Sequence, residues 1–141
     1  MESKQRVLIV EDDRWFADIC ADSLSDCDVR ICHDAQTAIE AIDAARPDII
    51  LLDLMLPGSN GVAFLQELRS YQDTRETPVI VCSSLRMSPA QRQGMKVFDP
   101  VFFLNKTDAT PERLQKVISH QSSVTHEKVL TDDSRSSGRQ T

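Results

Sequence analysis

The sequence is poor in glycine and aromatic residues and has fewer basic than acidic residues. The low glycine content and the negative charge exclude several classes of protein. Only 4 of the 141 residues are glycine, and aromatic residues make up 5%. No Gly-rich loop follows the first apolar segment, so neither a P-loop nor a dinucleotide-binding fold is supported. The formal net charge is −6, from 16 basic and 22 acidic residues. We therefore do not expect nucleic acid as the main partner, because its binding usually requires a basic face.

The four cysteines and the apolar runs exclude further classes. Cys20, Cys27, Cys32 and Cys82 are separated by 7, 5 and 50 residues, which matches no common zinc pattern. No apolar run approaches the length that crosses a membrane. The opening Met-Glu-Ser-Lys-Gln-Arg leads into only four apolar residues, which is too few for a signal peptide. We expect a cytoplasmic protein with reduced thiols and no membrane partner.

Five short apolar segments alternate with five segments that have helical periodicity. The apolar segments cover residues 7–10, 29–31, 49–52, 79–82 and 101–104. Side chains that can cap the helices are Asp13, Asp34, Ser88 and Thr110, and Pro follows the last two. The segment after Ser88 has a weak apolar stripe, so we expect a short helix there. This alternation predicts an α/β fold, a doubly wound five-stranded parallel sheet with helices on both faces.

The composition changes beyond residue 120. Residues 121–141 contain five serines, no aromatic residue and only three large aliphatic residues. Such a segment has too little apolar surface to form a core of its own. We expect one domain over residues 1–120 and a polar, disordered tail or linker over residues 121–141.

Polar side chains stand where four of the five apolar segments end. Glu11 and Asp12 follow the first segment, Asp53 the third, Ser83 the fourth, and Lys106 comes shortly after the fifth. Each residue alone could be an ordinary turn or cap residue. Because the carboxyl ends of parallel strands share one rim of the sheet, we expect these side chains to converge. The sequence therefore predicts a site at this rim.

Together these side chains suit the transfer of a phosphoryl group in the presence of a divalent cation. Gathered carboxylates favour a hard divalent cation such as Mg²⁺, and a carboxylate can attack a phosphoryl group to form an acyl phosphate. The ammonium of Lys106 and the hydroxyl of Ser83 would balance the phosphoryl oxygens. A phosphatase of the haloacid dehalogenase type would need a second Asp two residues after its nucleophile, where this chain has Met55. Three acids after the first segment would also repel the phosphate of a flavin.

Four stretches resemble the receiver domain of two-component response regulators, in the family's order and at its spacing. They read Val-Leu-Ile-Val-Glu-Asp-Asp, Ile-Ile-Leu-Leu-Asp-Leu-Met-Leu-Pro-Gly-Ser-Asn-Gly, Pro-Val-Ile-Val-Cys-Ser and Phe-Phe-Leu-Asn-Lys. The resemblance covers about residues 5–120. It implies a chemotaxis-type single-domain or detached receiver with the flavodoxin-like strand order 2-1-3-4-5.

The resemblance also implies a role for the acidic residues. Asp53 would accept a phosphoryl group, with Lys106 as its catalytic partner. Mg²⁺, with Mn²⁺ as an alternative, would be held by Glu11, Asp12, Asp53 and the backbone carbonyl of Met55. The domain would catalyse only its own phosphorylation and dephosphorylation, so we do not expect an enzyme in the usual sense.

The resemblance places a conformational switch beside this site. Ser83 and Lys106 would bind the phosphoryl group, and movement of Ser83 would be coupled to rotation of the aromatic Phe103. Without the resemblance, Phe103 would be an equally good core residue. The family usually has Pro after the lysine, where this chain has Thr107.

The resemblance finally implies the partners. The phosphoryl donor would be a sensor histidine kinase or a phosphotransfer protein. The output would be a protein target or an appended domain that binds the face made by the fourth helix, fifth strand and fifth helix, or a dimer that forms on phosphorylation. We do not expect DNA binding, because no helix-turn-helix follows residue 120. A docking or scaffold module that works without phosphorylation stays open as the alternative.

Overall fold

The computed structural model describes residues 4–56, 61–84 and 86–132, with side chains through residue 121. The strands are β1 (Arg6–Val10), β2 (Asp28–Cys32), β3 (Ile49–Leu52), β4 (Val79–Ser83) and β5 (Val101–Asn105). The α-helices are α1 (Arg14–Ser23), α2 (Ala35–Ala44), α3 (Gly61–Ser70), α4 (Pro89–Gly94) and α5 (Pro111–Asp132). Two short 3₁₀ helices, η1 (Met95–Phe98) and η2 (Lys106–Asp108), flank β5. Residues 57–60 of the second stretch that resembles the receiver family, Pro-Gly-Ser-Asn, lie outside the described residues.

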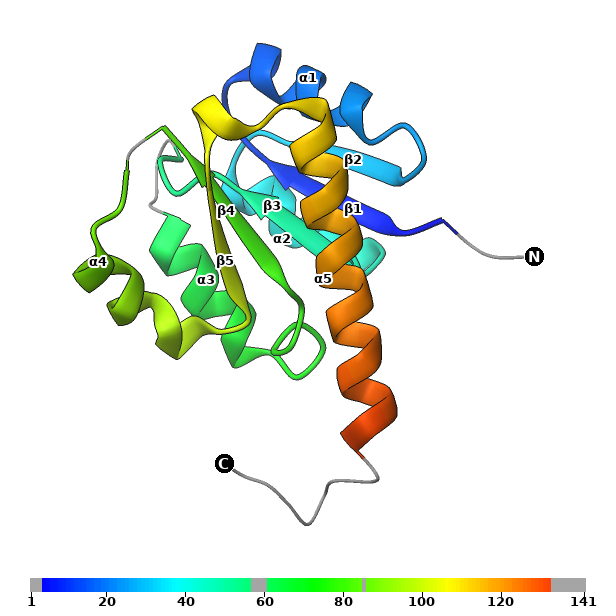
Figure 1. Cartoon of the computed structure of the whole chain (residues 1–141), viewed down its shortest axis with the longest axis vertical. Coiled ribbons are helices and arrows are strands. Elements are labelled where there is room, and N and C mark those ends of the chain that lie inside the picture. The colour runs from blue at the N-terminus through cyan, green and yellow to red at the C-terminus, as the bar shows by residue number, and fades with distance from the viewer. Residues whose placement is uncertain (1–3, 57–60, 85, 133–141) are drawn as a thin grey trace.

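The five strands form one sheet in the order β2-β1-β3-β4-β5, and every neighbouring pair is parallel. This confirms the predicted fold class and strand order. Figure 1 shows the sheet running across the molecule, and the helices that connect its strands pack around it. Because all strands point the same way, their carboxyl ends meet at one edge, near the start of α1 and the end of β5.

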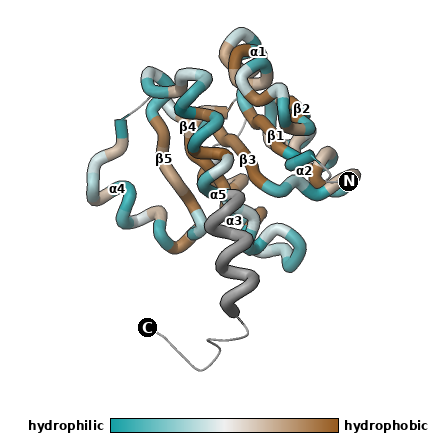
Figure 2. Tube along the Cα trace, turned by 45° about the vertical axis from the view of Figure 1, so that its right-hand side comes forward, coloured by the Kyte–Doolittle hydropathy of each residue, from teal (hydrophilic) through white to brown (hydrophobic). Residues whose placement is uncertain are grey.

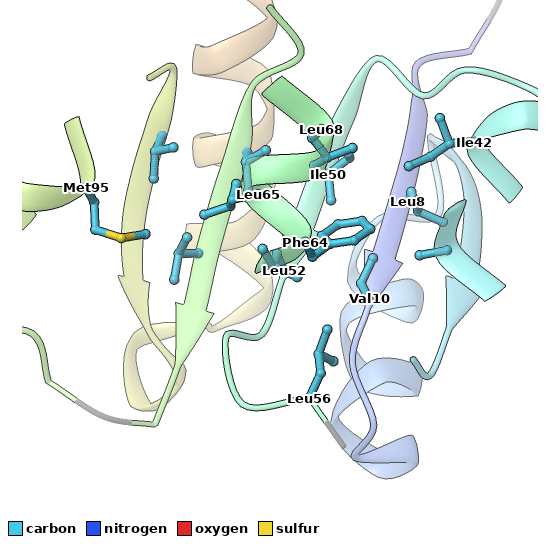
Figure 3. Close-up of a cluster of buried hydrophobic side chains, with 14 residues drawn as sticks. Leu8, Val10, Ile42, Ile50, Leu52, Leu56, Phe64, Leu65, Leu68 and Met95 are labelled. Carbon is cyan, nitrogen blue, oxygen red and sulfur yellow. The ribbon is translucent and has the colours of Figure 1, made fainter. Parts of the chain in front are cut away.

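The hydrophobic residues form two clusters, one on each face of the sheet. The central strand β3 supplies both, because Ile50 and Leu52 belong to one cluster and Ile49 and Leu51 to the other. Helices α2, α3 and η1 cover the first cluster, which Figure 3 shows around Phe64. Helices α1 and α5 cover the second. The hydrophobic strands therefore lie inside a more hydrophilic layer of helices and loops (Figure 2), as expected for a sheet buried on both faces.

The predicted helix starts are confirmed. The side chains of Asp13 and Asp34 accept hydrogen bonds from the backbone N–H groups of Phe16 and Thr37, and so cap α1 and α2. Ser88 forms a reciprocal capping box with Gln91 at the start of α4. These caps satisfy backbone donors that have no partner within the helix.

The fourth helix is short, as expected. Helix α4 ends at Gly94, and the chain continues as η1 to Phe98. No residue of α4 is buried, so packing gives this helix little support and its capping box at Ser88 sets where it begins.

Helix α5 is longer than the sequence indicated. It continues to Asp132, beyond residue 120, after which we expected a disordered tail. Residues 112–137 contain neither Pro nor Gly, so nothing in the backbone chemistry stops the helix at residue 120. Residues 133–141 lie outside the described part, and for them the polar tail stays a prediction. Within the described ranges, no helix is both long and apolar enough to span a membrane.

The first residue of α3, Gly61, holds the loop that follows β3. The N–H of Gly61 donates to the carbonyl of Leu54 at 2.8 Å, and a Cβ at Gly61 would lie 2.5 Å from the Cα of Leu54. Glycine is therefore required where this loop closes after β3.

At the other end of α3, Arg69 binds the chain that leads into β5. Its guanidinium donates to the carbonyl oxygens of Thr74 at 2.8 Å, Phe98 at 2.8 Å and Pro100 at 3.0 Å. The three carbonyls come from two separate segments, so this one side chain holds both of them against α3.

Candidate functional site

The strand ends converge as predicted. Glu11 and Asp12 follow β1, Asp53 follows β3, Ser83 ends β4 and Lys106 begins η2 after β5. Strands β1 and β4 are the two neighbours of β3 in the sheet, so the groups from β1 and β4 flank Asp53. Backbone hydrogen bonds fix Asp53 and Glu11 at this rim, because the N–H of Asp53 donates to the carbonyl of Val10 at 3.0 Å and the N–H of Glu11 donates to the carbonyl of Cys32 at 2.9 Å.

Three carboxylates form the acidic part of the site. Oxygen atoms of Glu11, Asp12 and Asp53 all lie within 4.8 Å of one another. Glu11 is 2% and Asp53 5% exposed, whereas Asp12 is exposed to solvent. Close carboxylate oxygens with one open side suit a hard cation with oxygen ligands, which keeps some of its waters. These residues could hold a divalent metal ion.

Lys106 bridges the two buried carboxylates. Its Nζ lies 2.9 Å from Oε1 of Glu11 and 3.3 Å from Oδ2 of Asp53. The same ammonium lies 4.7 Å from the centre of the Phe16 ring, a cation–π contact. The sequence predicted Lys106 near Asp53, but it indicated neither the shorter ion pair with Glu11 nor the contact with Phe16. The sequence indicated no role for Phe16 in the site.

Backbone groups hold the carboxylates from the other side. The N–H of Met55 donates to Oδ1 of Asp53 at 3.0 Å, and the N–H of Asp13 donates to Oε2 of Glu11 at 3.1 Å. Each of the two carboxylates therefore contacts a backbone donor on one side and the Lys106 ammonium on the other. These contacts limit the rotation of both side chains. The ring nitrogen Nδ1 of His33 also lies 2.8 Å from the carbonyl oxygen of Glu11, a neighbour that the sequence did not indicate.

The electrostatics of the site follow from burial and charge. Burial raises the pKa of Glu11 to about 7, with Lys106 opposing the rise and Asp53 adding to it. Burial acts to lower the pKa of Lys106, but the adjacent carboxylates of Glu11 and Asp53 outweigh it and raise that pKa. Lys106 is therefore a fixed positive charge, whereas Glu11 changes its charge near neutral pH.

The two residues predicted to form a switch lie on neighbouring strands. Ser83 is buried at the end of β4, and Phe103 is half-buried in β5, opposite Val81 in the sheet register. The guanidinium of Arg92 in α4 lies 5.9 Å from the centre of the Phe103 ring. Met55 is 58% exposed, and its backbone N–H is the group that contacts Asp53.

Thr107 has a local role of its own. Oδ1 of Asn105 accepts hydrogen bonds from the N–H of Thr107 at 3.0 Å and from its hydroxyl at 2.7 Å. A proline could make neither bond, because it has no N–H and no hydroxyl. The Asn105–Thr107 pair therefore supports the turn that carries Lys106.

The chain is similar to known proteins over most of its length. A family model described as the response regulator receiver domain matches residues 7–119. DNA-binding response regulator MtrA of Mycobacterium leprae is 39% identical over 69 residues, which is 48% of this chain and 31% of the relative. Protein-glutamate methylesterase/protein-glutamine glutaminase of Pyrococcus abyssi is 35% identical over 92 residues, which is 62% of this chain and 24% of the relative. The matches thus span about a third or less of these relatives.

Solved structures resemble the fold closely. Chemotaxis response regulator CheY4 of Vibrio cholerae is 25% identical with a TM-score of 0.76, and the match covers 84% of this chain and 98% of that chain. NtrX from Brucella abortus is 26% identical with a TM-score of 0.81, covering 95% of this chain and 30% of that chain.

Proposed function

Because the chain belongs to the response regulator receiver family, we propose that it accepts a phosphoryl group on Asp53 and passes the signal to a protein partner. The donor is a phosphohistidine on a sensor histidine kinase or phosphotransfer protein. The observation that carries the proposal is the position of Asp53, a buried carboxylate that shares one ammonium with Glu11 and one rim with Ser83.

The reaction needs a carboxylate that is held in place and charge that balances the incoming group. Oδ1 of Asp53 is held by the Met55 N–H and Oδ2 by Lys106, so the nucleophile keeps one orientation. In the transfer, a carboxylate oxygen forms a bond to phosphorus, the phosphorus–nitrogen bond to histidine breaks, and the imidazole keeps that electron pair and is protonated. The Lys106 ammonium and the Ser83 hydroxyl stabilise the phosphoryl oxygens.

The acidic residues fit a magnesium ion. Asp12, Asp53 and the Met55 carbonyl are the direct ligands that we propose, with Mn²⁺ as an alternative ion. Glu11 already accepts from Lys106 at 2.9 Å and from the Asp13 N–H, so we place it as an outer acid that orients the metal's waters. When bound, the ion neutralises carboxylates and phosphoryl oxygens that would otherwise repel each other.

Ser83 and Phe103 transmit phosphorylation of Asp53 to the surface of the domain. Movement of the Ser83 hydroxyl toward a phosphoryl group on Asp53 would open space beside β5, into which the half-buried Phe103 can rotate. That rotation remodels the face made by α4, β5 and α5, where a target or an appended domain binds. The change is a shift between two populations rather than a new fold.

The test is phosphorylation with acetyl phosphate and Mg²⁺, followed by intact-protein mass spectrometry. The wild-type chain is expected to gain one phosphoryl group, and Asp53→Asn to gain none. Asp43→Asn is a matched control, since Asp43 is an exposed acid of α2, and it should be labelled like the wild type. If the wild type gains no phosphoryl group and shows no response to beryllofluoride, the phosphorylation-independent docking module becomes the better proposal.

A further inference from the structure

A cavity of about 240 Å³ lies beside the proposed switch. It is bounded by the ends of β4 and β5, by the segment that leads into α4, by α4 itself and by the start of α5. Ser83 and Phe103 are both part of its wall. A ligand in this cavity would therefore touch the two residues that carry the proposed change of state.

Three arginines give this cavity its charge. Arg86, Arg92 and Arg113 line it, and among the described residues of its wall Asp108 is the one acid. All three arginines are exposed, and within the described ranges none of them forms an ion pair, whereas Lys106 pairs with two acids and Arg46 with one. We call this cavity the arginine pocket. It is a basic site on a chain whose net charge is −6.

The rest of the wall is apolar. Met87 and Phe103 are both half-buried and line the arginine pocket together with the buried Leu104. The Arg92 guanidinium lies over the Phe103 ring at 5.9 Å. A ligand with both a carboxylate and an apolar side chain would match this wall, because planar guanidinium groups bind carboxylates with two parallel hydrogen bonds.

We infer that the arginine pocket binds an acidic segment of a partner protein, whose carboxylates pair with the arginines and whose apolar side chain packs on Phe103 and Met87. Arginine clusters commonly recognise acidic motifs in this way. A nucleic acid is the poorer occupant, because the remainder of this acidic chain would repel a polyanion. The binding itself does not depend on phosphorylation, but its regulation through Ser83 and Phe103 rests on the proposed function of Asp53.

The binding test uses a short fluorescein-labelled peptide of alternating Glu and Leu, measured by fluorescence anisotropy at low salt. The wild-type chain should bind it and should bind the same peptide with Gln in place of Glu much more weakly. The double variant Arg92→Gln and Arg113→Gln should weaken binding on the order of tenfold. Arg75→Gln removes an exposed arginine from the loop between α3 and β4, outside the wall of the pocket, and should change affinity less than about twofold.

Three outcomes would overturn the inference. Equal binding of the Glu and Gln peptides would remove the role of the carboxylates. An equal loss in the Arg75 variant would show a general charge effect rather than a site. Full competition by free glutamate at the concentration of the peptide would show a pocket for small anions, not for a protein segment.

A second measurement separates this inference from the proposed function. Labelling by acetyl phosphate should be unchanged in the Arg92 and Arg113 double variant, since neither residue contacts Asp53. Beryllofluoride with Mg²⁺ should alter peptide affinity in the wild type and not in Asp53→Asn. If Asp53 takes no phosphoryl group but the peptide still binds through the arginines, the pocket stands and the proposed function fails. If Asp53 is phosphorylated but the arginines do not affect peptide binding, only the pocket fails.

Discussion

Replacing Lys106 with methionine removes the ammonium that lies between two buried carboxylates. Its Nζ is 2.9 Å from Oε1 of Glu11 and 3.3 Å from Oδ2 of Asp53. Methionine keeps an unbranched side chain of similar length that can still pack on the Phe16 ring. The effect of Lys106→Met on the free energy of unfolding is therefore mainly electrostatic.

The distances allow the size of this effect to be worked out. With an effective dielectric constant of about 20, Coulomb's law gives about 6 kcal/mol for the pair at 2.9 Å and about 5 kcal/mol for the pair at 3.3 Å. Two terms offset this attraction. Burying the ammonium costs several kcal/mol. In the variant, protonation of Glu11 removes the unpaired charge and recovers about 1.4 kcal/mol for each unit by which the pKa of Glu11 exceeds the ambient pH. We expect a net loss of about 3 kcal/mol near pH 8, at the low end for breaking a buried pair.

The loss should depend on pH, and its direction follows from Glu11. Burial raises the pKa of this carboxyl to about 7 from 4.5. Because the folded chain holds the proton more tightly than the unfolded chain, this contribution to stability is fully present below pH 4.5 and is lost as the pH rises through 7. Near pH 6 most Glu11 is already neutral in the folded wild type and gains less from the ammonium. The loss in Lys106→Met should then shrink to about 1.5 kcal/mol.

The assay is urea unfolding without divalent metal, followed by circular dichroism near pH 6 and near pH 8. Lys116→Met is the matched control, since Lys116 is an exposed lysine of α5, and it should change stability by less than about 0.5 kcal/mol. A loss below about 1 kcal/mol in Lys106→Met near pH 8, or equal losses at the two pH values, would refute the electrostatic reasoning.

Three further results are expected. Mg²⁺ affinity, measured by titration calorimetry, should fall as the pH drops below about 7, because a proton on Glu11 reduces the negative charge of the site. The variant Glu11→Gln should bind Mg²⁺ with an affinity that depends less on pH. A pH dependence that persists in this variant would contradict the assignment to Glu11. Gly61→Ala should lower the free energy of unfolding by about 2 kcal/mol, since the new Cβ meets the Leu54 backbone at 2.5 Å, and an unchanged urea midpoint would show that the loop shifts at no cost. Arg69→Met should cost about 3 kcal/mol in the same assay, because three carbonyl oxygens lose their donor, whereas a similar loss in Arg75→Met would point to charge alone.

Much of the fold could be predicted because its strands are buried on both faces. Residues 49–52 are an unbroken aliphatic run, and the structure places alternate members in the two hydrophobic clusters. The helix starts were also accessible, because capping by Asp13, Asp34 and Ser88 depends on the side chain and backbone within a few residues. Each of these signals is local in the chain.

The end of α5 could not be predicted in the same way. The composition after residue 120 is polar and indicated a tail, but the helix continues to Asp132. Helix propagation needs only one added hydrogen bond for each residue, so a polar segment without Pro or Gly can extend a helix that is anchored at its start. In this chain the anchor is the packing of Leu114 and Ile118 against the sheet.

The sequence by itself determined which chemical groups are present at the strand ends and in what order they occur. Three carboxylates, one hydroxyl and one ammonium follow apolar runs, and parallel pairing of those runs brings them to one edge. Only the tertiary structure decided that Lys106 lies closer to Glu11 than to Asp53, that Phe16 lies against its ammonium, and that three arginines from separate segments line one cavity. Those distances depend on how α1, α4 and α5 pack on the sheet, and such packing joins residues that are far apart in the chain and leave no local pattern in it.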